Sequence, residues 1–249
     1  QQAISVWNTV DGRSIYRIPM SFYSTTALKF LPDGTKLVTG YSAGNVQLWN
    51  PSVFKAITPF DVSTSNGNQI GELCFVDSGK TLLAIDTKGV LDVRSAETGK
   101  KITRFPSYPQ HVHCMNASRE GKIWVTTSRS KSVLDIWDMA AGNTVQSIEG
   151  VRDDVVLVRF AADGDLVLTA QKDNILKVWR SSDGSLLQTL DLQSEAECIM
   201  SSPVGHDLVT AAGTALRFWK INWPRKSDSE PVLTERFCIP GSSVQIHSM

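Results

Sequence analysis

The sequence predicts an all-β fold, a β-propeller of four-stranded antiparallel blades, and two periodic markers predict it. A tryptophan, replaced in one repeat by arginine, recurs every 40 to 45 residues, and a turn glycine recurs every 41 to 45 residues. A period of this length with strand-like units is typical of propellers. The first marker occupies Trp7, Trp49, Arg94, Trp137, Trp179 and Trp219, and the second occupies Gly34, Gly79, Gly121, Gly164 and Gly205.

Each repeat has the pattern of four strands joined by three turns. In the clearest copy the strands are expected at 155–161, 166–170, 175–179 and 186–190, with Asp163-Gly164 as the first turn. Asp-Gly between apolar runs is a strong hairpin signal. The second strands are apolar on both faces, which predicts sheets that stack face to face. The fourth strands alternate, which suits an outer edge partly in solvent.

We expect one propeller domain over 1–249, with five complete blades and partial blades formed by the chain ends. The partial blades are 1–22, which holds two strands, and 241–249, which holds one strand at 243–247. Either the closing blade lacks a strand, or the chain is an excerpt from a longer protein, and we favour the excerpt. The complete blades are expected at 23–62, 68–106, 110–150, 153–192 and 195–240.

Composition excludes several function classes. Lys+Arg and Asp+Glu are both 25, so the net charge of zero offers no bulk attraction for nucleic acid or an acidic membrane surface. The chain contains neither a run of eighteen apolar residues nor a signal-peptide pattern at its start, so we expect a soluble protein. Four cysteines lie in apolar runs without a close pair, which predicts buried, reduced thiols and a cytoplasmic or nuclear location. They are Cys74, Cys114, Cys198 and Cys238.

The strands that end in tryptophan resemble the WD-repeat family of β-propellers, and the resemblance covers residues 4–247. Trp137-Asp138 keeps the Trp-Asp ending of the family, whereas the other tryptophans have lost the aspartate. The Gly-His pair of the family is absent, and the aspartate six residues before the tryptophan survives only as Asp173. These departures indicate degenerate repeats, held by apolar packing more than by polar networks.

The resemblance implies a rigid, non-catalytic platform that recognises partner proteins within a larger protein or complex. Two alternatives stay open: a sensor or autoinhibitory propeller of a longer signalling protein, and a propeller enzyme with a site around the central channel. The sequence contains no nucleophile elbow, phosphate-binding glycine loop or His-Glu-x-x-His segment, so we expect neither an enzyme nor a cofactor.

Two histidines form the one pattern that points toward a metal. His111 and His113 would lie on one face of a strand, a spacing that metal sites use. No carboxylate or thiolate ligand accompanies them by spacing, and most carboxylates belong to turns such as Asp183-Gly184. We therefore expect no metal site.

One loop surface has the composition of a binding site. The turns between second and third strands and the loops that lead into first strands should gather on one face. Cations beside aromatic rings suit acidic or phosphorylated partner segments. Alternatively these loops are simply polar, because nearby aspartates dilute the charge. The candidate residues are Lys88, Tyr108, His111, Arg129, Lys131, Arg152 and Lys172.

Overall fold

The computed structural model describes most of the chain as two compact units, Gln1–Thr103 and Arg104–Met249. Each unit is described by itself below. The last predicted partial blade, 241–249, lies outside the described residues. The described residues are 3–8, 10–19, 24–31, 33–53, 55–57, 62–63, 67–102, 111–128, 132–152, 154–161, 164–202, 207–222 and 232–240.

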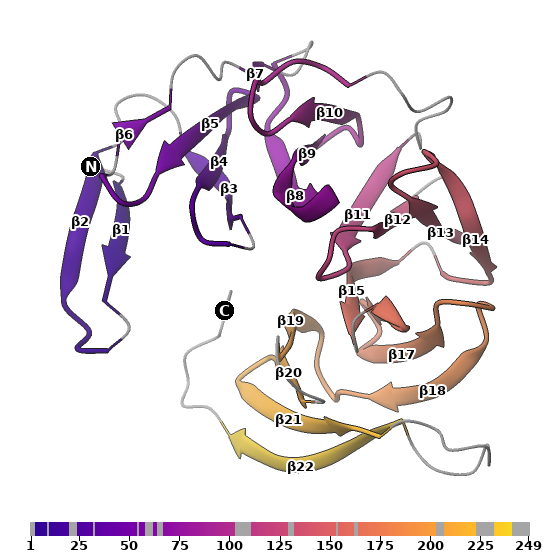
Figure 1. Ribbon diagram of the computed structural model, residues 1–249. Helices are drawn as coiled ribbons and strands as arrows, with labels where there is room; N and C mark the ends of the chain where they lie inside the picture. Colours follow the sequence, from indigo (N-terminus) through magenta and orange to yellow (C-terminus); the bar gives the residue numbers. More distant parts are fainter. Residues whose placement is uncertain are drawn as a thin grey trace. The chain divides into compact units, whose positions relative to one another are not determined.

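The first unit contains three antiparallel sheets (Figure 1). β1 pairs with β2, β8 to β10 form a three-stranded sheet, and β3 to β6 form a sheet in which β7 also pairs with β5. The elements are β1 (Ala3–Trp7), β2 (Ser14–Pro19), β3 (Thr25–Phe30), β4 (Leu37–Tyr41), β5 (Asn45–Asn50), β6 (Lys55–Ala56), β7 (Val62–Ser63), β8 (Ile70–Val76), the 3-10 helix η1 (Asp77–Gly79), β9 (Thr81–Asp86) and β10 (Leu91–Ser95).

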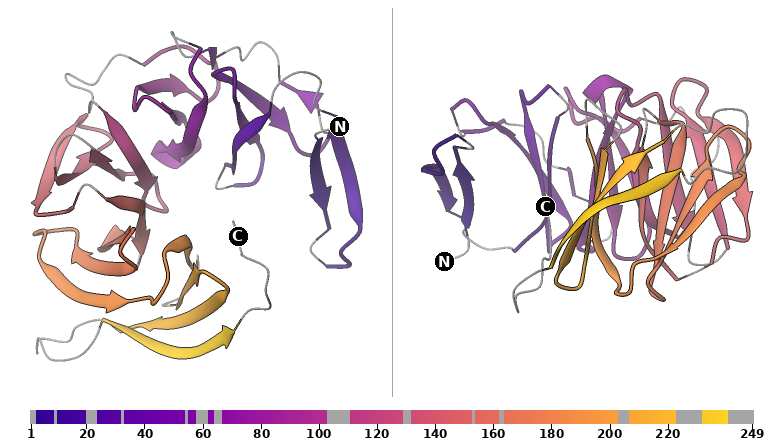
Figure 2. Two further views of the ribbon diagram at one scale, coloured as in Figure 1. Left: turned by 180° about the vertical axis from the view of Figure 1, so that it is seen from behind. Right: turned by 90° about the horizontal axis from the view of Figure 1, so that it is seen from below.

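The second unit contains three four-stranded antiparallel sheets, each with its strands in chain order. The sheet β15–β18 lies between the other two in both views of the unit (Figures 1 and 2). The strands are β11 (Val112–Ala117), β12 (Ile123–Ser128), β13 (Val133–Asp138), β14 (Asn143–Glu149), β15 (Val155–Ala161), β16 (Leu166–Gln171), β17 (Ile175–Arg180), β18 (Leu186–Asp191), β19 (Ala196–Ser201), β20 (Asp207–Ala212), β21 (Ala215–Ile221) and β22 (Leu233–Pro240).

The core lies between stacked sheets, as the apolar second strands predict. Every residue of β4, β9 and β16 is buried. In the second unit Val158 of β15 packs against Val125 and Leu134 of the sheet β11–β14. On the opposite face of the sheet β15–β18, Leu168 packs in one cluster with Ile199 of β19. A strand enclosed on both sides is mostly apolar on both faces, which explains why these strands do not alternate. Their buried polar residues, such as Thr169 and Asp86, form hydrogen bonds.

A polar link ties the third strand to the second in four sheets. The tryptophan Nε1–H donates to a threonine hydroxyl at 2.9 to 3.0 Å in each of them. A buried indole N–H needs such an acceptor. The expectation that apolar packing outweighs polar networks did not include this repeated bond. The four pairs are Trp49 with Thr39, Trp137 with Thr126, Trp179 with Thr169, and Trp219 with Thr210.

The sheet β8–β10 departs from this pattern at two places at once. Arg94 occupies the tryptophan position, and Ala84 occupies the position of the threonine, as the strand register shows. Arg94 Nε donates to Asp92 Oδ2 at 2.7 Å, and its Nη1 donates to the Gly99 carbonyl at 3.1 Å. An ion pair within one strand thus replaces the bond between strands. Of the expected fourth strand, the described residues show one bridge, between Arg94 and Lys101.

One expectation about burial needs correction. Cys74, Cys114 and Cys198 are buried and carry free thiols, but Cys238 is exposed. It lies in β22, the outer strand of its sheet, in which every residue from 234 to 240 is exposed. Trp7 keeps the repeat spacing but is 59% exposed, because its two-stranded sheet supplies no second strand to cover the indole.

The aspartate of one predicted turn acts as the sequence predicts, whereas Asp163 lies outside the described residues. In the turn between β17 and β18, Asp183 Oδ1 accepts from the Ser185 hydroxyl and backbone N–H, and Oδ2 accepts from Arg180. The Ser185 bonds, followed by the Arg180 bond, lower the pKa of Asp183 to about 2. Within the described part of the chain, no helix has the length and apolar character that a membrane span requires.

Candidate partner-binding surface

The predicted surface residues fall into three groups. Lys88 belongs to the first unit, and His111, Arg152 and Lys172 belong to the second. The remaining three, Tyr108, Arg129 and Lys131, lie outside the described residues. The assignment of all seven to one binding surface therefore stays a prediction.

Lys88 lies in the turn between β9 and β10, and a buried carboxylate shapes this turn. Asp86 is 3% exposed, and its Oδ1 accepts from the backbone N–H groups of Lys88 and Val90 at 2.8 and 2.9 Å. Its Oδ2 accepts from the Asn68 amide at 2.9 Å. Asp86 thus fixes the turn from within and leaves the Lys88 side chain exposed.

Arg152 precedes β15, and two aspartates share its guanidinium. Nη1 lies 2.8 Å from Asp173 Oδ2, and Nη2 lies 3.0 Å from Asp154 Oδ2. Gln171 Nε2 donates to the other oxygen of Asp154 at 3.2 Å. These bonds connect the loop before β15 to the turn between β16 and β17, so the charge of Arg152 is largely balanced within the protein. Lys172 in the same turn is exposed.

The histidine pattern does not have the predicted geometry. His111 precedes β11 and has φ of 56°, in the left-handed region, so it is not part of the strand. A register shift between Val112 and Cys114 further disturbs the alternation at His113. The prediction of two imidazoles on one strand face is therefore wrong. No group of three or more His, Cys, Asp or Glu residues that could hold a metal ion exists within the described residues.

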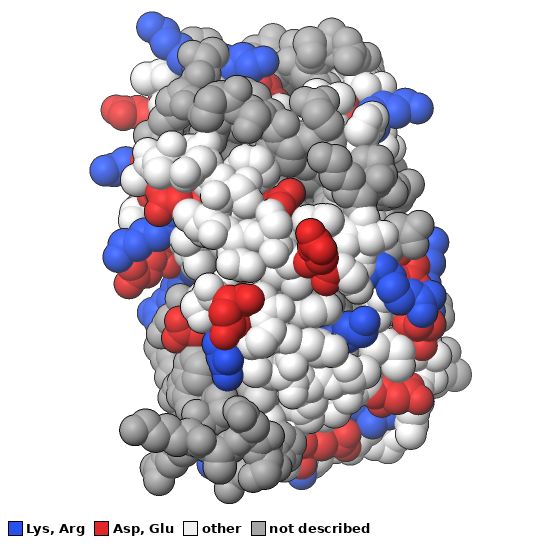
Figure 3. Space-filling view, turned by 90° about the vertical axis from the view of Figure 1, so that its right-hand side faces the viewer, with Lys and Arg blue, Asp and Glu red and all other residues white. Residues whose placement is uncertain are grey.

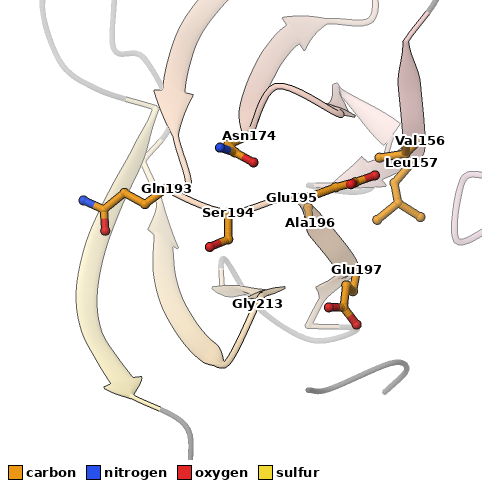
Figure 4. Close-up of a pocket in the computed structure, with 9 residues that line it drawn as sticks. All are labelled: Val156, Leu157, Asn174, Gln193, Ser194, Glu195, Ala196, Glu197 and Gly213. Atoms are coloured by element: carbon orange, nitrogen blue, oxygen red, sulfur yellow. The ribbon is translucent and has the colours of Figure 1, made fainter. Parts of the chain in front are cut away.

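A pocket of about 800 Å³ in the second unit lies where the loops of two neighbouring sheets meet (Figure 4). Asn174 from the β16–β17 turn, Ser194 and Glu195 from the segment before β19, and Gly213 from the β20–β21 turn line it. Val156 and Leu157 of β15 add apolar surface, and Gln193, Ala196 and Glu197 complete the lining. These are the two kinds of loop that the sequence predicts to gather on one face.

Left-handed backbone conformations build the rim of this pocket. Asn174, Gln193 and Gly213 have φ of 69°, 64° and 58°. The Gln193 backbone N–H donates to Asp191 Oδ1 at 2.7 Å, and Arg217 Nη2 donates to Gln193 Oε1 at 2.9 Å. At Gly213 a Cβ atom would lie 3.0 Å from Ser194 Oγ, so glycine meets both the backbone and the steric requirement there.

The pocket residues were missed because cations and neighbouring aromatic residues were selected from the loops, and acidic and amide residues were not. The run Gln193-Ser194-Glu195 directly before a first strand was the available signal. On the side of the molecule where β14 and β18 lie, positive and negative side chains are interspersed (Figure 3). The pocket of Figure 4 instead has two glutamates, Glu195 and Glu197, and neither lysine nor arginine in its lining.

Comparison with known families finds a match at two places in the chain. The family described as WD domain, G-beta repeat matches residues 21–50 and 142–180. These two stretches of the chain match the WD40 repeat. Both matches end with a third strand, since β5 ends at Asn50 and β17 ends at Arg180. The WD40 register thus coincides with the strands that carry Trp49 and Trp179.

Curated relatives of this chain are longer proteins. The periodic tryptophan protein 2 homolog of Caenorhabditis elegans is 20% identical over 204 residues, 82% of this chain and 22% of the relative. Protein Notchless of Drosophila melanogaster is 28% identical over 171 residues, 67% of this chain and 34% of the relative. The anaphase-promoting complex subunit cdc20 of Dictyostelium discoideum is 20% identical over 230 residues, which are 88% of this chain and 45% of the relative. The chain therefore spans less than half of each relative.

Solved structures confirm the fold class. A chain in the crystal structure of a mitotic checkpoint complex superposes with a TM-score of 0.80 at 17% identity, covering 99% of this chain and 74% of that chain. The computationally designed Ika8 protein superposes with a TM-score of 0.71 at 18% identity. This match covers 98% of this chain and 70% of the designed chain. The predicted all-β propeller fold is confirmed, and the four-stranded antiparallel sheets are its blades.

Proposed function

We propose that this WD40 chain is a non-catalytic scaffold that recognises partner proteins or peptides through its loops, as part of a larger protein or complex. The WD40 repeats carry this proposal. Two similar proteins are named as a complex subunit and as part of a checkpoint complex, which supports an assembly role. Blades with buried, apolar second strands provide a rigid frame on which loops can differ without loss of the fold.

The partner class that the cationic loop residues favour is an acidic or phosphorylated segment. Lys88 and Lys172 are exposed in turns between second and third strands, as this proposal requires. Arg152 would have to break its ion pairs with Asp154 and Asp173 to bind a partner anion. We therefore expect Arg152 to contribute least to the affinity for the partner. We further propose a location in the cytoplasm or nucleus, which the three buried free thiols support.

An array of acidic peptides and phosphopeptides tests this function on the full chain. The double variant Arg129→Glu/Lys131→Glu should lose at least about tenfold in affinity, because each charge-assisted hydrogen bond contributes about 1.5 to 3 kcal/mol. Lys100→Glu/Lys101→Glu is the matched control, since both lysines are exposed and lie outside the candidate set. Equal binding by both double variants would exclude the cationic surface as the recognition site.

A further inference from the structure

The cavity between the sheets β15–β18 and β19–β22 points to a second kind of recognition on the same loops. We propose that this pocket binds a lysine or arginine side chain of a partner segment. The proposal rests on the proposed function in that the ligand is a protein segment. It concerns residues outside the cationic set. The partner group is positively charged, whereas the cationic set would bind a negatively charged segment.

The charge of the pocket favours an organic cation. Glu195 lines the pocket, its side chain is exposed, and it forms no ion pair with any residue that the structure describes. Arg217, which holds the rim through Gln193, directs its other terminal nitrogen to Glu235 at 3.2 Å. Glu195 therefore presents a carboxylate to the pocket without a cation from the described part of the chain to balance it.

The walls of the pocket suit a long side chain with a charged end. A volume of about 800 Å³ lies in the range of pockets that hold organic groups and far exceeds that of a single ion. In Figure 4 Glu195 points toward the side that Val156 and Leu157 form. Lysine and arginine combine an aliphatic stem with a charged end, so the stem matches the apolar wall and the end matches the carboxylate.

The polar groups of the rim add acceptors for a charged N–H donor. Asn174 and Ser194 line the pocket beside Glu195. The Leu192 N–H donates to the Asn174 carbonyl at 2.9 Å, which holds the backbone at Asn174. A metal ion is a poorer match, because calcium takes six to eight oxygen ligands and no group of three potential ligands exists in the described residues.

Peptides that differ in one residue test the pocket on the full chain. The probes are acetylated nonapeptides with randomised flanks and a central Arg, Lys, Gln, Leu or Glu. Peptides with central Arg or Lys should bind at least about tenfold more tightly than those with central Gln, because a charge-assisted bond is about twice as strong as a neutral one. Glu195→Gln should remove this preference, and Glu195→Lys should abolish binding of the Arg and Lys peptides.

The control is Glu149→Gln, which removes the same charge from an exposed site at the end of β14, outside the pocket. An equal loss in Glu149→Gln and Glu195→Gln would show bulk attraction and overturn the proposal. A preference for Arg and Lys that survives in Glu195→Gln, or a lack of binding by every nonapeptide, would overturn it as well. Each of these three results leaves the acidic-peptide experiment with Arg129 and Lys131 as the separate test of the proposed function.

Discussion

The blades β15–β18 and β8–β10 differ at the tryptophan position of the third strand. In the first, Trp179 is 5% exposed and its Nε1–H donates to Thr169 across the strand pair at 2.9 Å. In the second, Arg94 bonds to Asp92 within its own strand, and Ala84 replaces the threonine. The tryptophan and the threonine are absent together. We infer that the two residues act as one unit, in which each depends on the other.

The two arrangements differ in how completely their polar atoms are bonded. In the tryptophan blade the indole N–H has its acceptor. In the arginine blade Asp92 is 8% exposed, and its Oδ1 is buried without a hydrogen-bond partner. An unpaired buried oxygen costs about 1 to 3 kcal/mol. We infer that the blade β8–β10 is held less firmly at this position than the tryptophan blades.

The largest effect is expected from the loss of a buried tryptophan. Trp137 is 5% exposed, its ring stacks on Trp124 at 5.4 Å, and its Nε1–H donates to Thr126. Trp137→Ala should lower the free energy of unfolding by about 3 to 5 kcal/mol, measured by urea denaturation. Trp7→Ala is the matched control and should change it by less than about 0.5 kcal/mol, because Trp7 is 59% exposed. Similar losses in both variants would contradict the difference in burial.

A smaller loss is expected when the ion pair of the arginine blade is broken. Arg94→Met keeps the aliphatic stem but leaves the Asp92 carboxylate without its partner at 2.7 Å. The free energy of unfolding should fall by about 2 kcal/mol, below the value for a fully buried pair because the Arg94 side chain is 21% exposed. Asp92→Leu added to Arg94→Met should restore most of the loss. If the double variant is no more stable than Arg94→Met, the unpaired carboxylate is not the cause.

The third prediction concerns the threonine hydroxyl that accepts the hydrogen bond from the tryptophan. Thr169→Val removes the acceptor and leaves the buried Trp179 N–H unpaired, which should cost about 1 to 2 kcal/mol in urea denaturation. Thr189→Val is the matched control, because Thr189 is exposed in β18 of the same blade. A loss of the same size at Thr189 would attribute the effect to the change of side-chain type instead of to the bond.

Local patterns predicted the strands, whereas contacts between distant residues escaped them. The ranges 155–161, 166–170, 175–179 and 186–190 agree with β15 to β18 to within one residue, because turn residues and strand periodicity are local signals. The bond between Trp179 and Thr169 was missed, although a threonine nine to eleven residues before four of the tryptophans was visible. The exposure of Cys238 depends on what covers β22, which local sequence does not encode.

The candidate surface was harder to predict for the same reason. The charge of Arg152 is balanced by Asp173, 21 residues away, and this pairing depends on the fold. The pocket joins Val156, Asn174, Glu195 and Gly213, which belong to two sheets and are spread over more than fifty residues. Selection of loop residues by positive charge chose Arg152 without detecting its pairing with aspartates, and it missed the glutamates of the pocket.

The smallest expected effect tests directly whether tryptophan and threonine form one unit. Arg94→Trp alone places an indole beside Ala84, which offers no hydroxyl, and Ala84→Thr alone places a hydroxyl in a site that is 1% exposed. Each single variant should be destabilised, whereas the double variant should regain about 0.5 to 1 kcal/mol relative to the sum of the two. A double-mutant cycle by urea denaturation measures this coupling. Additive losses would mean that Trp179 and Thr169 owe their pairing to the surroundings of their own blade and that the arginine blade has diverged beyond these two positions.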